Sequence, residues 1–169
     1  MRFLIIYICM LSSAFAMDFP NNENIIVHKK VKKYDGLTFL DQNNEQINLN
    51  EFQGKLILLN FWASWCAPCK KEMPSLDRLQ SNNFLNNIKI FPINVGRDTT
   101  EKAESFFKEL KIQNLDIYFD SPNTLAKEFS LRGIPTTILI NKKGEEFARI
   151  LGSIDFDEKK FIDWLSSYN

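Results

Sequence analysis

The chain has 169 residues, and its 21 basic and 21 acidic side chains cancel to a formal net charge of zero. Hydrophobic residues make up 44% and charged residues 25% of the sequence, which excludes a disordered chain. Zero net charge argues against a general nucleic-acid binder, and the longest apolar run is too short for an ordinary membrane span. The length predicts one domain whose core needs no metal or disulfide.

Residues 1–16 predict a secretory signal peptide. Arg2 precedes the short apolar run at residues 3–11, and Ala14-Phe15-Ala16 has the pattern of a cleavage site. We therefore expect cleavage after Ala16, export and a periplasmic location for the mature protein. An uncleaved membrane anchor is the alternative interpretation.

A polar segment at residues 17–33 is expected to form a tail or a loosely attached edge, followed by a folded domain at residues 34–169. Residues 37–40 and 46–49 flank the turn-forming sequence at residues 41–44. This pattern predicts a β-hairpin at the start of the domain.

The next three elements have the order strand, helix, strand. Residues 55–62 are apolar except for one asparagine, which predicts a strand buried on both faces. A helix is expected at residues 66–80, with a kink at Pro74, and a second strand at residues 88–95, weakened by Pro92.

The remaining chain predicts two more helices, a short strand and a terminal hairpin. A helix capped by Thr100 presents apolar residues at the i, i+3, i+4 and i+7 spacing of a core face. The later elements are expected at residues 115–119 (strand), 121–129 (helix), 136–140 and 146–151 (hairpin) and 157–168 (helix). The fold class is therefore α/β, a mixed central sheet flanked by helices, with an N-terminal β-hairpin extension.

Three cysteines are too few for a disulfide scaffold. Cys9 lies in the predicted signal peptide, and Ile8 before it stands where a lipoprotein signal needs a small residue, so we expect Cys9 to leave with the signal. The mature chain then keeps one close pair, Cys66 and Cys69. An exported pair of this kind meets an oxidising compartment.

The pair lies where the buried strand gives way to a helix. Unpaired N–H groups and the positive end of the helix dipole stabilise a thiolate there, and Pro68 fits the first turn. Cys66 is the expected attacking thiol, and the more buried Cys69 would resolve the mixed disulfide. The alternatives are a structural disulfide and half of a zinc site. Zinc normally takes four ligands, and the mature chain offers two cysteines and one histidine, His28, which we expect at the surface.

Residues 61–70, FWASWCAPCK, resemble the active-site signature of the thioredoxin superfamily. Residues 70–76, KKEMPSL, resemble the TlpA/ResA-like branch of exported thiol-disulfide oxidoreductases. Residues 93–96 and 132–137 match this branch in order and spacing. The resemblance extends from Leu37 to the C-terminus and implies a thioredoxin-like fold.

The resemblance also implies roles for residues outside the cysteine pair. Pro135 should follow a cis peptide bond and expose the Ile134 backbone for pairing with an extended substrate, unless it is an ordinary proline at a strand start. Glu72 should lie near the thiols, where partial burial raises its pKa toward neutrality and lets it transfer protons, unless it is a solvated helix residue. Trp65 and Pro68 should shape the substrate surface.

Asn60 departs from the pattern of cytosolic thioredoxins, which carry a buried aspartate at the matching strand position. An amide cannot exchange protons, so proton transfer is expected to fall to Glu72 or to water. This departure fits the TlpA/ResA-like branch.

The expected function is an exported thiol-disulfide oxidoreductase that reduces disulfides of partner proteins in cytochrome c or cytochrome oxidase assembly. The sequence Ala67-Pro68 lacks the histidine typical of strong periplasmic oxidases, which favours a reductant. We expect protein disulfide substrates, an upstream membrane electron donor, no cofactor, no metal and no nucleic acid. The protein should be soluble or loosely tethered to a membrane.

Four alternative functions remain. The first is a general periplasmic disulfide oxidase or isomerase. The second is a copper-site assembly factor of the Sco type, which needs a C-x-x-x-C motif and a distal histidine that this chain lacks. The third is a peroxiredoxin-like peroxidase, whose threonine-containing loop is missing, and the fourth is a noncatalytic module that binds through the cis-proline groove.

Overall fold

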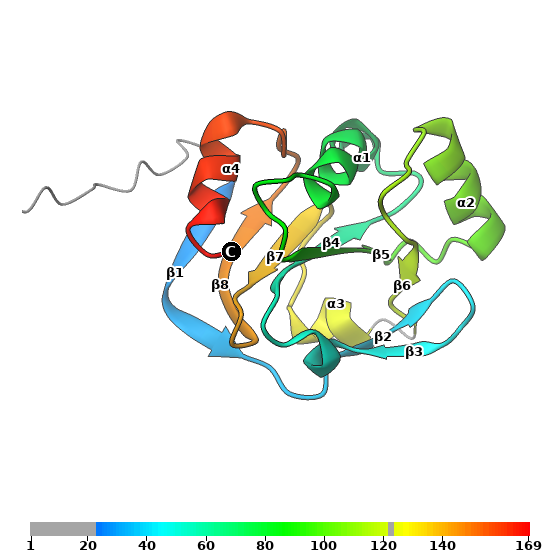
Figure 1. Cartoon of the computed structure of the whole chain (residues 1–169). Helices are drawn as coiled ribbons and strands as arrows, with labels where there is room; N and C mark the ends of the chain where they lie inside the picture. Colours follow the sequence, from blue (N-terminus) through cyan, green and yellow to red (C-terminus); the bar gives the residue numbers. More distant parts are fainter. Residues whose placement is uncertain (1–22, 122–123) are drawn as a thin grey trace, which may run out of the picture.

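The computed structural model describes residues 23–121 and 124–169, which form one eight-stranded sheet with helices on both faces (Figure 1). The predicted signal peptide at residues 1–16 lies outside the described residues. The strands are β1 (Ile25–Lys33), β2 (Thr38–Asp41), β3 (Gln46–Asn48), β4 (Leu56–Trp62), β5 (Ile88–Asn94), β6 (Tyr118–Phe119), β7 (Thr136–Ile140) and β8 (Glu145–Leu151). The helices are α1 (Ala67–Gln80), α2 (Thr100–Glu109), α3 (Thr124–Glu128) and α4 (Lys159–Ser166), with a 3₁₀ helix at Leu49–Phe52.

The sheet has the strand order β1-β8-β7-β4-β5-β6-β2-β3 and mixes parallel and antiparallel pairs. β4 is parallel to β5 and antiparallel to β7, and β5 is parallel to β6. The hairpin β2–β3 joins the far edge through an antiparallel pairing of β2 with β6. The predicted mixed sheet and its N-terminal hairpin are confirmed.

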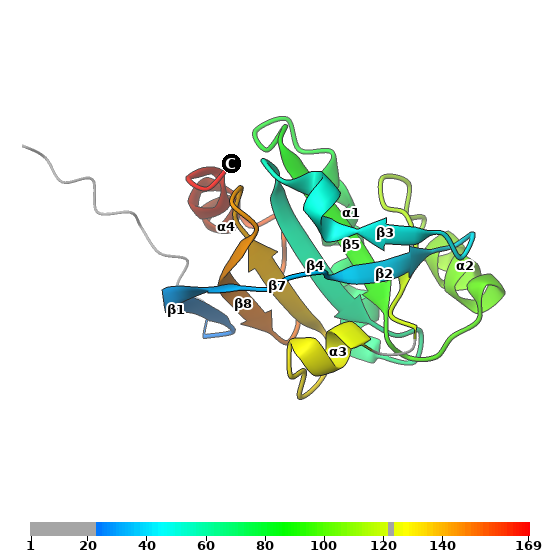
Figure 2. The same ribbon diagram turned by 90° about the horizontal axis from the view of Figure 1, so that it is seen from below.

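β4 is the central strand, and each of its residues is buried. Leu58 and Trp62 belong to the core under α1, α2 and α4, whereas Leu59 and Phe61 belong to the core on the opposite face, under α3 and the 3₁₀ helix. Figure 2 shows this second face, with α3 lying across the sheet. Alternating side chains of a continuously apolar strand therefore fill both cores, as the sequence predicts.

β1 is an edge strand of the sheet and pairs with β8. The sheet therefore begins at Ile25, nine residues before the expected start of the domain at residue 34. The expectation that His28 is a surface residue is wrong. Its Nε2 atom lies 2.6 Å from Oε1 of the buried Glu146, because pairing with β8 brings β1 alongside that carboxylate.

Other elements differ from the prediction in detail. The N-cap of α2 is Thr99 rather than Thr100, because its hydroxyl accepts the hydrogen bond from the Lys102 amide. β6 has two residues where five were expected. β5 continues through Pro92, which the sequence analysis expected to weaken it. β6 pairs only with the last two residues of β5, so Pro92 has one neighbouring strand, β4. On the side without a neighbouring strand, no ladder hydrogen bond needs the N–H that proline lacks.

Candidate active site

The cysteine pair lies at the junction of β4 and α1. The Cys66 amide donates to the Ala63 carbonyl at 3.1 Å, closing a turn, and α1 begins with Cys66 as its N-cap. A disulfide of 2.03 Å joins Cys66 to Cys69. Cys66 is 4% exposed and Cys69 is fully buried, so Cys66 is the more accessible of the two cysteines.

A backbone amide of α1 contacts the Cys66 sulfur. The Cys69 amide donates to Sγ of Cys66 at 3.3 Å, and Pro68 occupies the first helical turn, where no N–H is needed. The same amide and the start of the helix would stabilise a Cys66 thiolate once the disulfide opens. The local chemistry therefore suits Cys66 as a nucleophile.

The peptide bond between Ile134 and Pro135 is cis, as the resemblance implies. Thr136, the next residue, lies opposite Phe61 near the end of β4, so the cis bond and the cysteine turn share one end of the sheet. Trp65 is 67% exposed and lines a groove of about 470 Å³ together with Val95 and Ile134. This groove borders the turn that carries Cys66.

Glu72 lies on the buried face of α1 and is 1% exposed. The Asn60 Nδ2 atom donates to Glu72 Oε1 at 2.8 Å and to Thr137 Oγ1 at 2.9 Å. Burial raises the pKa of Glu72 to about 7, outweighing the lowering effect of Asn60, the Ile154 backbone and the Ser153 side chain. At neutral pH this carboxyl can therefore both hold and release a proton.

Asp98 is an anchor for the active-site turn that the sequence analysis missed. Its carboxylate accepts hydrogen bonds from the Ser64 amide, the Ser64 hydroxyl and the Asn94 side chain, each at 2.8 Å, and it pairs with Lys102 at 2.6 Å. Burial acts to raise the pKa of Asp98, but the hydrogen bonds from Lys102, Ser64 and Asn94 lower it to about 2. The charged carboxylate therefore ties the turn before Cys66 to the end of β5 and the start of α2.

Gly96 permits a close approach at the same turn. A Cβ atom at this position would lie 2.4 Å from Cβ of Ala63 and 3.0 Å from Nε1 of Trp65. The space between the end of β5 and the active-site turn therefore admits no side chain. The sequence signal was present, because residues 93–96 belong to the segment that resembles the TlpA/ResA-like branch.

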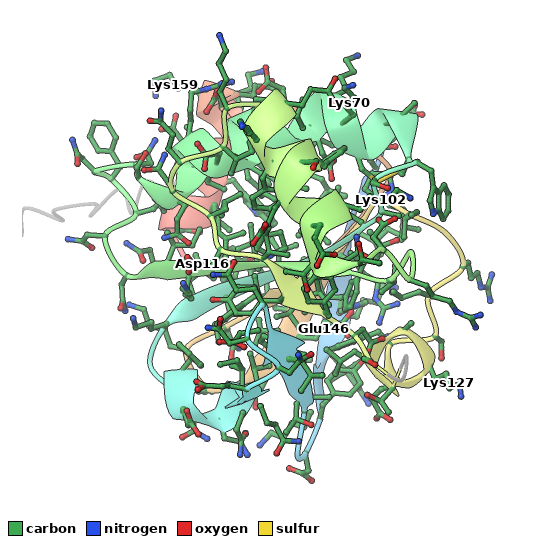
Figure 3. The ribbon with its side chains drawn as sticks, turned by 90° about the vertical axis from the view of Figure 1, so that its right-hand side faces the viewer. Lys70, Lys102, Asp116, Lys127, Glu146 and Lys159 are labelled. Carbon is green, nitrogen blue, oxygen red and sulfur yellow. A yellow bond between two sulfur atoms is a disulfide. The ribbon has the colours of Figure 1, made fainter. Side chains whose placement is uncertain are left out.

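Glu146 is the centre of a buried polar cluster where β1 pairs with β8. Its fully buried carboxylate accepts from Tyr34 at 2.6 Å, lies against His28 and pairs with Arg149. Arg149 also donates to the Phe129 carbonyl at 2.9 Å, five residues before Ile134. Glu146 is fully buried, and its label in Figure 3 lies among the central elements, whereas Lys70, Lys127 and Lys159 lie at the outline of the molecule.

The side chains of this cluster keep Glu146 ionised. Burial acts to raise the pKa of its carboxyl, but the hydrogen bonds from Arg149, Tyr34 and His28 lower it to about 2. Arg149 lines a second groove of about 500 Å³ with Ile134 and Pro135. No local sequence pattern identifies this cluster, because its members come from β1, β8 and the connection between β1 and β2.

Within residues 23–121 and 124–169, no three histidine, cysteine, aspartate or glutamate side chains gather as a metal site. The same part of the chain contains no helix with the length and apolar character needed to cross a membrane.

Residues 27–145 match the family model described as the AhpC/TSA family. The chain belongs to the AhpC/TSA family. Among its relatives is the thiol-disulfide oxidoreductase ResA of Bacillus subtilis, which is 30% identical over 114 residues, covering 68% of this chain and 63% of ResA. The sporulation thiol-disulfide oxidoreductase A of the same organism is 32% identical over 110 residues, covering 64% of this chain and 66% of that protein.

Solved structures of thiol-disulfide oxidoreductases also resemble this chain. The crystal structure of StoA from Bacillus subtilis has a TM-score of 0.62 and 30% identity, covering 76% of this chain and 96% of StoA. A DsbF homologue from Corynebacterium diphtheriae has a TM-score of 0.71 at 22% identity, covering 88% and 95% of the two chains, and shows the shared fold. Within the thioredoxin superfamily, the chain is thus a TlpA/ResA-like protein.

Proposed function

We propose that the protein is an exported thiol-disulfide oxidoreductase that reduces disulfides in partner proteins. The observation that carries the proposal is the Cys66–Cys69 disulfide at the start of α1, at the same end of the sheet as the cis bond before Pro135. The relatives named thiol-disulfide oxidoreductases support the same chemistry.

The reduced protein would act in two steps. The Cys66 thiolate attacks a substrate disulfide, forming a mixed disulfide and releasing the first substrate thiolate. Cys69 then attacks Cys66, which restores the Cys66–Cys69 disulfide and releases the second substrate thiolate, while Glu72 accepts the proton that Cys69 loses. Two electrons pass from the protein to the substrate, so a thiol donor must reduce the protein again.

Substrate binding is assigned to the surface around this turn. Trp65, Pro68 and Ile134 would contact the polypeptide beside its disulfide, and the backbone at the cis bond would pair with it as an extended strand. The exposure of Trp65 and the groove that it shares with Ile134 support this assignment.

The physiological setting is proposed from the sequence. A signal peptide at residues 1–16 would export the protein to the periplasm, where a membrane electron donor would keep it reduced. Partner proteins in cytochrome c or cytochrome oxidase assembly are the proposed substrates. N-terminal sequencing of exported material should give Met17 as the first residue, and retention of Met1 would favour an uncleaved anchor.

The decisive experiment traps substrates in cells with the Cys69→Ala variant. Because attack by Cys66 survives and resolution does not, mixed disulfides should accumulate and disappear on reduction. The double variant that also carries Cys66→Ala is the matched control and should trap nothing. If Cys69→Ala traps no partner, and the wild-type protein does not reduce insulin with a dithiol donor, the proposed activity is refuted.

The direction of electron flow has its own test. Alkylation of the wild-type protein in intact cells should find Cys66 and Cys69 mainly as thiols if the protein is a reductant. A pair that is mainly oxidised at rest would instead support an oxidase.

A further inference from the structure

Two buried polar atoms without a hydrogen-bond partner belong to one pair of side chains. They are Oδ1 of Asn60 and Oε2 of Glu72. The other ends of the same two groups are joined, because Nδ2 of Asn60 donates to Oε1 of Glu72 at 2.8 Å. An unpaired buried polar atom costs about 1–3 kcal/mol, so two in one pair call for an explanation.

The inventory of donors shows what is missing. The two hydrogens of Asn60 Nδ2 are directed to Glu72 Oε1 and Thr137 Oγ1, which leaves the amide with an unused acceptor. A carboxylate has only acceptors and cannot serve Asn60 Oδ1. A protonated carboxyl has one O–H donor, which is the group that Oδ1 lacks.

We propose that in the disulfide form Glu72 carries a proton on Oε2 and donates it to Oδ1 of Asn60, closing a cyclic acid–amide pair. One proton satisfies both unpaired atoms. Asn60 is then a positioning residue, because it holds the carboxyl in one orientation. Its Nδ2 donor lowers the pKa of Glu72, whereas its Oδ1 acceptor stabilises the protonated form. Thr137 holds the amide in turn, and Thr137 lies two residues after the cis proline.

The other groups that act on Glu72 are uncharged. They are the Ile154 backbone and the Ser153 side chain, both from the segment between β8 and α4. The Ser153 hydroxyl is the rival acceptor for the Glu72 proton. Burial raises the pKa of Glu72 to about 7, so the protonated form is well populated at neutral pH.

The inference rests on the proposed function, in which Glu72 accepts the proton of Cys69. In that step the bond between Cys66 and the substrate sulfur breaks, the Cys66–Cys69 bond forms, and the Cys69 proton moves to the Glu72 carboxylate. The product is the disulfide form with a protonated Glu72, which Asn60 would stabilise. Asn60 would thereby favour completion of the resolution step.

The test follows the two side chains by ¹³C NMR in the purified wild-type disulfide form between pH 5 and 9. The Glu72 carboxyl carbon should titrate as its proton leaves. The Asn60 carbonyl carbon should move upfield with the same midpoint, because its oxygen loses a hydrogen-bond donor. A downfield or absent Asn60 shift would overturn the proposal, and so would a Glu72 carboxyl that is already ionised at pH 5.

Variants separate Asn60 from the rival acceptor. Ser153→Ala is the matched control. It removes a group that lowers the pKa of Glu72, so it should raise the Glu72 midpoint slightly and leave the coupled Asn60 shift in place. Asn60→Leu should move the Glu72 midpoint by more than Ser153→Ala does. A midpoint that moves only in Ser153→Ala would assign the proton to Ser153 and overturn the proposal. The titrations need no turnover, so a failure of the proposed function appears separately, as wild-type protein that does not reduce insulin.

Discussion

Glu72→Gln tests the energetic cost of the buried carboxyl. Burial raises the pKa of Glu72 in the folded protein from 4.5 to about 7. Because the pKa of Glu72 is higher in the folded than in the unfolded protein, protonated Glu72 contributes to the free energy of unfolding. This contribution is complete below pH 4.5 and is lost as the pH rises through about 7. At about 1.4 kcal/mol for each pKa unit, the wild-type protein should lose about 3 kcal/mol across this range.

Glutamine removes this loss and keeps the shape of the protonated carboxyl. Its amide N–H can donate to Asn60 Oδ1 where we place the O–H of Glu72. The free energy of unfolding of Glu72→Gln should therefore match the wild type at pH 4.5 and exceed it by about 3 kcal/mol at pH 8.5.

Urea unfolding of the disulfide form at the two pH values measures this difference. With a slope of about 2 kcal/mol per molar urea, the variant midpoint at pH 8.5 should lie about 1.5 M above the wild-type midpoint. Glu104→Gln on the exposed face of α2 is the control and should retain the wild-type pH dependence. An equal loss of stability in Glu72→Gln and the wild type would refute the assignment of this loss to Glu72.

Three further predictions concern the surroundings of the site. Gly96→Ala should lower the free energy of unfolding by about 1–3 kcal/mol in urea, because its Cβ would overlap Ala63; an unchanged midpoint would show that the turn moves freely. Asp98→Ala should raise the KM for insulin by a larger factor than it slows alkylation of reduced Cys66, because the turn before Cys66 loses its anchor. Equal factors would contradict a role of Asp98 in substrate positioning. Glu146→Gln should cost about 3 kcal/mol in thermal or urea unfolding, because it leaves the Arg149 charge unpaired; a loss below about 1 kcal/mol would mean that Arg149 finds another partner.

The sequence by itself determined the architecture and the reactive pair. The continuous apolar run at residues 55–62 predicted a strand buried on both faces, and β4 is such a strand at the centre of the sheet. Periodic apolar residues predicted α2 and α4, whose buried faces are confirmed. The C-x-x-C spacing lies within one helical turn, so local geometry alone brings Cys66 and Cys69 together. The cis bond before Pro135 followed from the resemblance rather than from any physical pattern.

Element boundaries were less accessible to the sequence. Thr99 and Thr100 are equally good capping residues, and only the path of the chain entering α2 selects Thr99. The strand character of β1 was hidden by its lysines, because an edge strand pairs through its backbone and can leave charged side chains in solvent.

The tertiary structure decided which polar side chains meet. Glu72 meets Asn60 across 12 residues of sequence, Ser64 meets Asp98 across 34, and His28 meets Glu146 across 118. Whether a carboxyl is neutral or charged depends on which donors and how much apolar surface surround it, and these come from other elements of the fold. The sequence therefore determined which residues carry the sulfur chemistry, and the resemblance singled out Glu72. Only folding supplies the burial and the neighbouring groups that let the Glu72 carboxyl hold a proton.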